Sequence, residues 1–239
     1  MSDSKISLKD LLEAGCHFGH QARRWHPKMK PYLYAVRDGI HIFDLAKTKE
    51  GLDEACEYLR KLTVAGKTVV FVGTKRQAKA IIKEEAKKAG TPFVAERWLG
   101  GVITNWDQLK KSIRKLTEMK EKKEKGEYKK YTKKEQILID REIARLEKLF
   151  GGLESLEELP EAIFVVDTKK EEAAVREANQ KGIAVVAIVD SNSNPDLIDY
   201  IIPANDDAVG SIKIIVEAVA AAVQKGKEAA KKKGKKKDD

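Results

Sequence analysis

The sequence predicts an α/β fold in which a mostly parallel sheet is covered by helices and a helical hairpin projects from it. Three short apolar runs rich in β-branched residues, Val69–Val72, Ile163–Asp167 and Ala184–Val189, predict strands that are buried on both faces, as in a parallel sheet. Amphipathic stretches alternate with these runs along the chain. The alternation stops between Asn105 and Glu158, where the spacing is helical and no strand is predicted.

Two shorter runs, Pro92–Ala95 and Tyr200–Ile202, complete a set of five candidate strands and are expected toward the sheet edges. The helices expected around the strands are Gly51–Leu62, Arg76–Ala89, Lys169–Lys181 and Ala208–Lys225. The last of them carries an apolar stripe from Ile212 to Val223. This alternation is typical of a sheet whose parallel strands are joined by right-handed crossovers.

The interruption predicts two antiparallel helices. One apolar seam is formed by Leu109, Ile113, Leu116 and Met119, and a second by Ile139, Ile143, Leu146 and Leu149. A reversal is expected at Gly126–Tyr131, followed by a cap at Thr132. With 15 basic and 9 acidic groups between Asp107 and Phe150, the outer faces are wet and mildly positive. An arm that reaches a second partner and a solvated decoration both fit this charge.

These patterns divide the chain into a discontinuous α/β domain, residues 1–106 and 155–224, an inserted hairpin, residues 107–154, and a lysine-rich tail, residues 225–239. The net charge is +9, and the tail, with eight lysines against three acidic residues, supplies more than half of it. A block of Lys with Ala and Gly predicts disorder. Such a tail either binds phosphate groups without regard to sequence or only keeps the chain soluble.

Several classes of protein are disfavoured by composition. The two cysteines, Cys16 and Cys56, are too few for a disulfide framework and form no Cys-x-x-Cys pair. Residues 1–7 contain no apolar signal region, and no apolar stretch approaches the roughly 20 residues that a membrane span needs. We therefore expect a soluble cytoplasmic protein without a membrane partner.

Ligands of open parallel sheets bind beyond the carboxyl ends of the strands, so these loops are where a catalytic site is sought. Gly73–Arg76 could meet a phosphate at the start of a helix, but it is not a Walker loop, and no Gly-x-Gly-x-x-Gly occurs. Asp167, Asp190 and Asn205–Asp207 close other strands with acidic side chains, which serve hydrolases but equally turns and helix caps.

A metal site is a further hypothesis for these loops, because His17 or His20 could join the acidic groups in an oxygen and nitrogen ligand set. No spacing in the sequence fixes these groups near one another. We therefore predict no enzyme activity, no cofactor, no metal and no small-molecule substrate.

Two segments are rich in contact chemistry. Gln21–Lys30 places four basic groups around Trp25 and Pro27, and an extended segment of this kind suits base stacking and phosphate contact in RNA. Glu96–Trp106 combines two tryptophans, an arginine, a glycine pair and an Asn, which suits recognition of nucleic acid or protein. In each segment the alternative is that the tryptophans are anchors packed into a core.

Several motifs closely resemble the family of the second protein of the small ribosomal subunit, in its bacterial form. They are Leu12–His20, Trp25–Met29, Phe71–Lys75, Arg97–Gly101, Thr104–Trp106, Ile188–Pro195 and Ile202–Ala208. The motifs follow the family's order from residue 8 to about residue 225. The resemblance therefore covers nearly the whole chain and leaves out only the lysine-rich tail.

The resemblance implies a doubly wound, flavodoxin- or Rossmann-like sheet of five mostly parallel strands with an inserted coiled-coil hairpin, in agreement with the pattern. It also implies a structural component of the small (30S) ribosomal subunit, without catalytic activity, placed where head and body meet on the solvent side. The family contacts small-subunit ribosomal RNA and neighbouring proteins. It helps to dock the large first protein of the subunit, which captures messenger RNA.

The residues expected to contact RNA are Arg23, Arg24, Trp25, Lys28, Lys30, Lys75, Arg76, Arg97, Trp98 and Asn105. The cationic members would bind phosphates, while Trp25 would stack on a base or anchor its loop. Trp98 and Trp106 either face RNA or pin the hairpin to the sheet. We expect the hairpin to carry part of the interaction with the large messenger-capturing protein.

Two other functions compete with this one. The first is an enzyme or phosphate-ligand binder that uses Asp167 and Asp190 at the switch point of the sheet. The second is a free RNA-binding regulator that does not reside in a particle. The sequence favours neither function: the enzyme motifs are incomplete, and no standard RNA-binding module is present.

Overall fold

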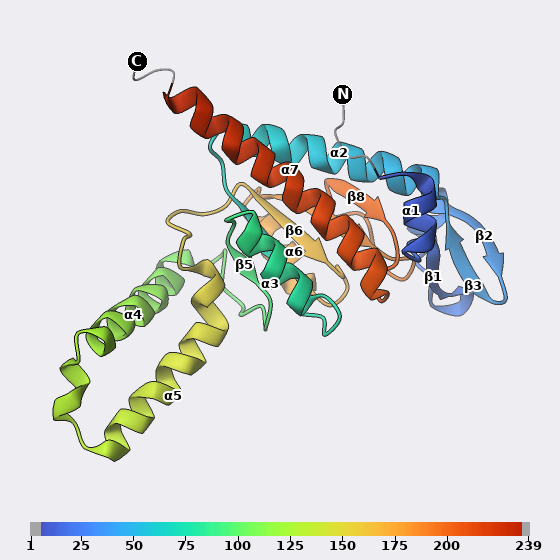
Figure 1. The fold of residues 1–239 in the computed structure, drawn as a ribbon. Helices are drawn as coiled ribbons and strands as arrows, with labels where there is room; N and C mark the ends of the chain where they lie inside the picture. Colours follow the sequence, from blue (N-terminus) through green and yellow to red (C-terminus); the bar gives the residue numbers. More distant parts are fainter. Residues whose placement is uncertain (1–5, 236–239) are drawn as a thin grey trace.

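Five parallel strands form the central sheet, and each coincides with a predicted apolar run (Figure 1). The strands are β4 (Val69–Val72), β5 (Phe93–Val94), β6 (Ala162–Val166), β7 (Ala184–Val189) and β8 (Tyr200–Pro203). Their order is β5-β4-β6-β7-β8. The chain adds β5 on one side of β4 and then β6, β7 and β8 on the other side, so the switch point of the sheet lies between β4 and β6. These findings come from a computed structural model that describes residues 6–235.

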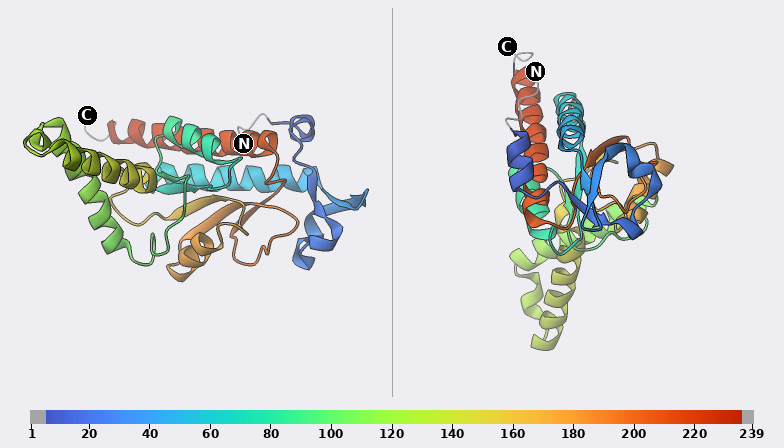
Figure 2. Two further views of the ribbon diagram at one scale, coloured as in Figure 1. Left: turned by 90° about the horizontal axis from the view of Figure 1, so that it is seen from below. Right: turned by 90° about the vertical axis from the view of Figure 1, so that its right-hand side faces the viewer.

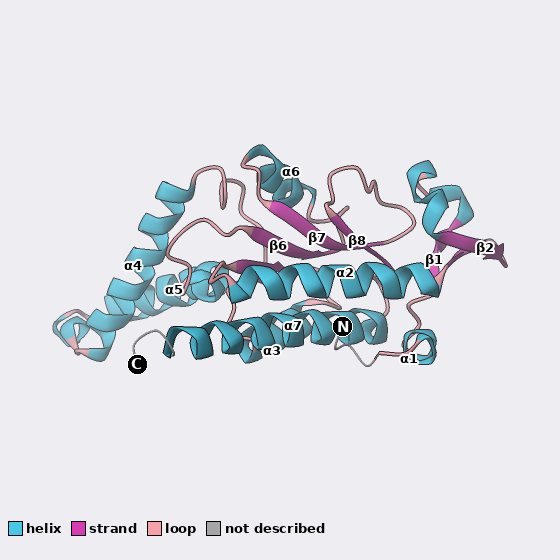
Figure 3. Cartoon of the chain, turned by 90° about the horizontal axis from the view of Figure 1, so that it is seen from above, coloured by secondary structure: helices cyan, strands magenta, loops and turns pink. Residues whose placement is uncertain are grey.

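Helices cover both faces of this sheet, which confirms the doubly wound prediction. On one face lie α2 (Leu45–Val64), α3 (Lys79–Lys88) and α7 (Val209–Lys235), and on the other lies α6 (Glu172–Gln180) (Figure 3). Alternate strand residues point to opposite faces. Phe71 packs in the core under α2 and α7, whereas its neighbour Val70 packs in the second core with α6. Both faces are therefore buried, which explains the continuous apolar runs.

The predicted helical hairpin consists of α4 (Trp106–Glu124) and α5 (Lys133–Phe150), joined by a 3₁₀ turn, η3 (Glu127–Lys130). It projects away from the sheet (Figures 1 and 2). Leu109, Ile113 and Leu116 of one seam and Ile143 and Leu146 of the other are buried, as their spacing predicts.

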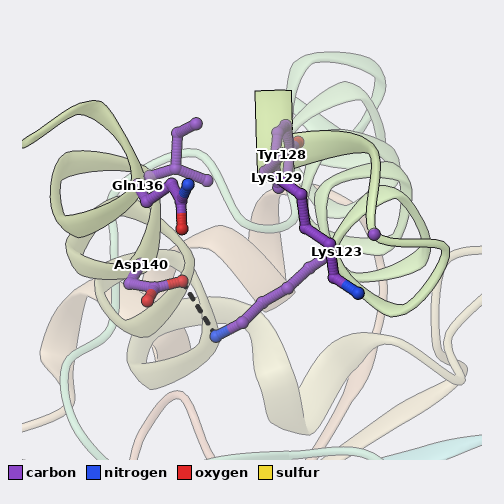
Figure 4. A pocket seen from close by; sticks show the side chains of 7 residues that line it. Lys123, Tyr128, Lys129, Gln136 and Asp140 are labelled. Atoms are coloured by element: carbon purple, nitrogen blue, oxygen red, sulfur yellow. Dashed lines mark ion pairs between the residues drawn. The ribbon is translucent and has the colours of Figure 1, made fainter. Parts of the chain in front are cut away.

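At the tip of the hairpin, Tyr128, Lys129 and Gln136 line a small hollow (Figure 4), and the Lys123 ammonium lies 2.8 Å from Asp140. A supercoil of the two helices stays a prediction. After α5, the turn η4 (Gly151–Leu153) leads back to β6.

The N-terminal part forms a second sheet that the sequence patterns do not predict. After α1 (Leu8–Glu13), the strands β1 (Phe18–Gln21), β2 (Leu33–Arg37) and β3 (Ile40–Phe43) pair antiparallel in the order β1-β3-β2. Between β1 and β2 the chain forms two 3₁₀ turns, η1 (Ala22–Arg24) and η2 (Pro27–Tyr32). The segment expected to be extended is therefore compact.

The lysine-rich tail also differs from the prediction. Helix α7 continues through Lys225 and ends only at Lys235, so the expectation of disorder from residue 225 onward is wrong for this stretch. A helix that is already nucleated extends at low cost through Ala and Lys, which are good helix formers. The last four residues lie outside the described part. Among the helices between residues 6 and 235, none has the length and hydropathy that a membrane span requires.

Candidate nucleic-acid interface at the carboxyl edge of the sheet

The segments singled out in the sequence gather at one edge of the sheet, where the parallel strands end. The loop with Lys75 and Arg76 follows β4, and Glu96–Trp106 follows its neighbour β5. The N-terminal segment is tied to the loop after β7, because Ser191 Oγ accepts from the His20 amide (2.8 Å) and its carbonyl accepts from the His26 amide (2.7 Å). The topology thus brings segments far apart in the chain to a common edge.

The N-terminal segment presents its cations to solvent around a packed tryptophan. Arg23, Arg24 and Lys30 are exposed, while Trp25 is half-buried with its ring centroid 4.9 Å from that of His41. Lys28 is exposed too, but its ammonium pairs with Asp196. Met29, fully buried, anchors η2 near the end of the segment. The result is a set of positive groups on two short 3₁₀ turns.

The loop after β5 is organised by one buried carboxylate that the sequence patterns do not identify. Glu177, on α6, accepts hydrogen bonds from the backbone amides of Gly101 (2.8 Å), Ile103 (3.0 Å) and Thr104 (3.0 Å). The indole N–H of Trp98 donates to the same carboxylate at 3.1 Å. Burial opposes ionisation of Glu177, but these donors outweigh it and lower the pKa of the carboxyl group. The loop is therefore held by a charged, fully satisfied acceptor.

The residues of this loop that are predicted to contact RNA fall into two groups, one buried and one exposed. Trp98 is 8% exposed and faces Glu177, so it anchors the loop, as the alternative reading proposed. Arg97 and Asn105 are exposed and remain available to a partner. The half-buried Trp106 is the first residue of α4 and packs against the second core. This packing fixes the root of the hairpin at the end of the loop.

Lys75 lies in a different setting from the one that the sequence predicts. Its ammonium is surrounded by Asp167 (3.2 Å), Asp206 (2.7 Å) and Asp207 (2.5 Å), and only 12% of its side chain is exposed. Burial acts against the charged form, but attraction to the carboxylates, chiefly Asp206, raises the pKa of Lys75. Its charge is neutralised within the chain. Arg76, next along the loop, is exposed.

His20 extends this cluster toward the N-terminal sheet. Its Nδ1 lies 2.9 Å from Asp190 Oδ1, and the hydrogen bond to Asp190 raises the pKa of His20 in spite of partial burial. Asp206 is almost fully buried, and burial together with repulsion from Asp190 and Asp167 raises its pKa to about 7. The cluster thus joins both sheets through alternating charges.

The same side chains form the only group between residues 6 and 235 that offers three close metal ligands. His20, Asp190 and Asp206 bring one ligand atom each within 4.8 Å of one another. Nitrogen and oxygen donors of this kind suit zinc and related ions. A bound cation would take the place of the Lys75 ammonium and the His20 proton. His17, the other candidate in the sequence, lies outside the group.

The switch point between β4 and β6 is filled by side chains. Glu171 accepts from the Thr74 amide at 2.9 Å, Lys170 Nζ lies 3.3 Å from the Thr74 carbonyl oxygen, and Lys75 bridges to Asp167. The Asp167 backbone adopts a left-handed φ of 69° at this point. The acidic residues of the competing enzyme hypothesis are thus engaged in internal pairs at the place where a doubly wound sheet binds its ligand.

Comparison with known proteins decides the family. The family model "Ribosomal protein S2" matches residues 11–226. The chain belongs to the ribosomal protein S2 family. It is accordingly a structural ribosomal protein and not an enzyme, with a role in translation.

Individual relatives agree along most of the chain. A protein of Roseiflexus sp. strain RS-1 is 50% identical over 92% of this chain and 84% of its own length. A protein of Coprothermobacter proteolyticus is 52% identical over 93% of this chain and 83% of its own length, and one of Petrotoga mobilis is 50% identical over 94% and 78%. Each of the three is named small ribosomal subunit protein uS2.

Proposed function

We propose that this chain is a structural component of the small ribosomal subunit in the cytoplasm, and that it binds ribosomal RNA through the carboxyl edge of its sheet. The main support is the set of exposed cations on turns and loops at this edge: Arg23, Arg24, Lys30, Arg76 and Arg97. Phosphate contacts of this kind position a protein on RNA, and their contribution to affinity is electrostatic. Lys28 contributes when it exchanges Asp196 for a phosphate.

Other members of the predicted set have supporting roles. Trp25, half-buried beside His41, can stack on a base through the exposed part of its ring, and Asn105 can donate or accept a hydrogen bond at the root of α4. Trp98 and Lys75 act indirectly, because one holds the loop and the other holds the acidic cluster. The proposed contact set is therefore smaller than the one the sequence predicts.

The experiment is reconstitution of the full chain with small subunits that lack it, across a salt series. We expect saturation at one copy for the unchanged chain. In Arg23→Gln/Arg24→Gln, the slope of log affinity against log salt should become shallower by about 1.5, since each phosphate contact accounts for about 0.7–0.9. A variant with the same loss of charge elsewhere, Lys9→Gln/Lys213→Gln, should keep the slope. An unchanged slope in the arginine variant would remove this segment from the RNA surface.

We further propose that the hairpin contacts other small-subunit proteins, including the large first protein that captures messenger RNA. Near its tip, Ile137 and Leu138 are each 53% exposed and Tyr131 is 42% exposed, on an otherwise charged arm. Exposed apolar groups rimmed by charge are typical of protein contacts. Replacing residues 107–154 by a short Gly-Ser linker should leave the chain on the subunit and release the large protein. Full retention of that protein would contradict the proposal.

A further inference from the structure

The end of α7, residues 225–235, is a basic helical segment that extends beyond the family match. The matched region ends at residue 226, whereas the helix continues to Lys235. Between residues 225 and 235 the sequence has six lysines and a single acidic residue, Glu228. The helix passes the end of α2 and points away from the α/β unit (Figures 1 and 3). We call this segment the α7 end.

The root of the α7 end is fixed on the body of the protein. Gly226 is packed so closely on α2 that an added Cβ would lie 1.9 Å from Thr63 Oγ1 and 2.7 Å from the Arg60 carbonyl oxygen. Lys227 donates to the carbonyl oxygen of Gly90 at 2.6 Å, which ties the helix to the turn after α3. The positive groups beyond this root, including the exposed Lys231 and Lys232, are therefore carried on a positioned helix.

The charge of the α7 end contrasts with that of the helices beside it. In α2, Lys61 lies 2.7 Å from Glu57, and in α3, Lys88 lies 2.8 Å from Glu84, so these cations are balanced by acids one turn away. Between residues 225 and 235 the sequence itself holds only one acidic residue for six lysines, so the segment has no comparable set of acids. Burial and the positive charge of Lys231 both lower the pKa of Lys227, which shows that like charges repel one another here. An anionic partner would relieve this repulsion.

Stabilisation of the helix by its own lysines does not account for the whole segment. Cations near a helix C-terminus interact favourably with the helix dipole, but the effect falls off within about the last turn. The lysines run from residue 225 to residue 235, which is about three turns at 3.6 residues per turn. The earlier ones lie too far from the terminus to serve this purpose.

We propose that the α7 end binds phosphate groups of ribosomal RNA, as a second RNA contact independent of the carboxyl edge of the sheet. This inference rests on the proposed function. Lysine ammonium groups contact phosphates as point charges without reading sequence. In Figure 1 the mildly basic hairpin and the α7 end both leave the α/β unit on the side away from the N-terminal sheet, but they diverge, so the α7 end is a separate basic projection.

The test uses the full chain with small subunits that lack it. In Lys231→Gln/Lys232→Gln, we expect the salt slope to become shallower by about 1–2, in line with about 0.7–0.9 per phosphate contact. The variant Lys231→Arg/Lys232→Arg should keep the slope, because it keeps both charges. Lys9→Gln/Lys213→Gln, on α1 and the first half of α7, removes the same charge and should also keep it. Circular dichroism should show equal helix content in all three variants.

The outcomes separate this inference from the proposed function. If the unchanged chain saturates at one copy and Lys231→Gln/Lys232→Gln binds with the same affinity and slope, the α7 end does not contact RNA. If the slope falls equally in the Lys9/Lys213 control, the lysines act only through net charge, which also overturns the inference. If the unchanged chain fails to saturate at one copy, the proposed function falls, and this inference falls with it.

Discussion

The indole N–H of Trp98 donates to the carboxylate of Glu177 across 3.1 Å, although 79 residues separate the two in the sequence. The same carboxylate accepts from three backbone amides of the loop that leads into α4. One side chain of α6 therefore sets both the shape of a loop with exposed recognition residues and the direction in which the hairpin leaves the sheet.

Replacing Glu177 by Gln should destabilise the fold. Gln retains one oxygen acceptor but turns an amino group toward donors, which leaves buried amides without a partner. We expect a loss of about 2–4 kcal/mol in the free energy of unfolding in urea at neutral pH. Glu172→Gln, on the exposed face of the same helix, should change it by less than about 1 kcal/mol. Equal effects of the two substitutions would mean that Glu177 does not hold the loop.

The contribution of Glu177 should depend on pH. Its pKa is lowered on folding, so its carboxylate stabilises the folded state fully above the pKa of the unfolded chain, near 4.5, and this stabilisation is lost as pH falls through the folded value. The difference in unfolding free energy between the unchanged chain and Glu177→Gln should be constant from pH 7 to 5 and shrink toward pH 3. Urea titrations at each pH measure it. A constant difference down to pH 3 would contradict this assignment.

Lys75 should be important for stability, since it neutralises three carboxylates at the switch point. Lys75→Met removes the cation from the largely buried Asp167 and Asp206, whereas Asp207, 54% exposed, keeps His20 at 3.4 Å. We expect a loss of about 3–5 kcal/mol in urea unfolding, the range found when a buried pair loses one partner.

A neighbouring ion pair provides the control for Lys75. Lys79, at the start of α3, lies 2.8 Å from Glu96, and about a third of each side chain is exposed. Lys79→Gln should therefore cost less than about 1 kcal/mol. If Lys75→Met were as mild as Lys79→Gln, the carboxylates of the cluster would have to be protonated or paired elsewhere.

The sequence predicts the central sheet and the hairpin because their signals are local. A strand buried on both faces must be apolar throughout, and a helix buried along one stripe must repeat every three or four residues. The second sheet is missed for a different reason. Its strands are short and half-exposed, and its one strong signal is the turn at Asp38 and Gly39, whose φ values of 52° and 74° suit a tight hairpin.

The site is only partly predictable. Exposure of Arg23, Arg24 and Arg97 follows from their charge and from the loops that carry them. The roles of Lys75 and Glu177 depend on partners about 80 to 130 residues away, which no local pattern encodes. One signal was present for Glu177, because it lies three positions after the buried Ala174 and thus on the apolar face of its helix.

A glycine at the contact between α2 and β8 gives a prediction that opposes helix propensity. In an exposed helix interior, Gly→Ala stabilises by about 1 kcal/mol. At Gly51, however, an added Cβ would lie 2.2 Å from the carbonyl oxygen of Ile201, a backbone atom that cannot turn away. Gly51→Ala should therefore lower the unfolding free energy by about 1–3 kcal/mol, since the helix must move off the sheet. Gly100→Ala, where no neighbouring atom lies within 4 Å, should change it by less than about 0.5 kcal/mol. A stabilised Gly51→Ala variant in urea would show that α2 packs less closely on β8 than the structure indicates.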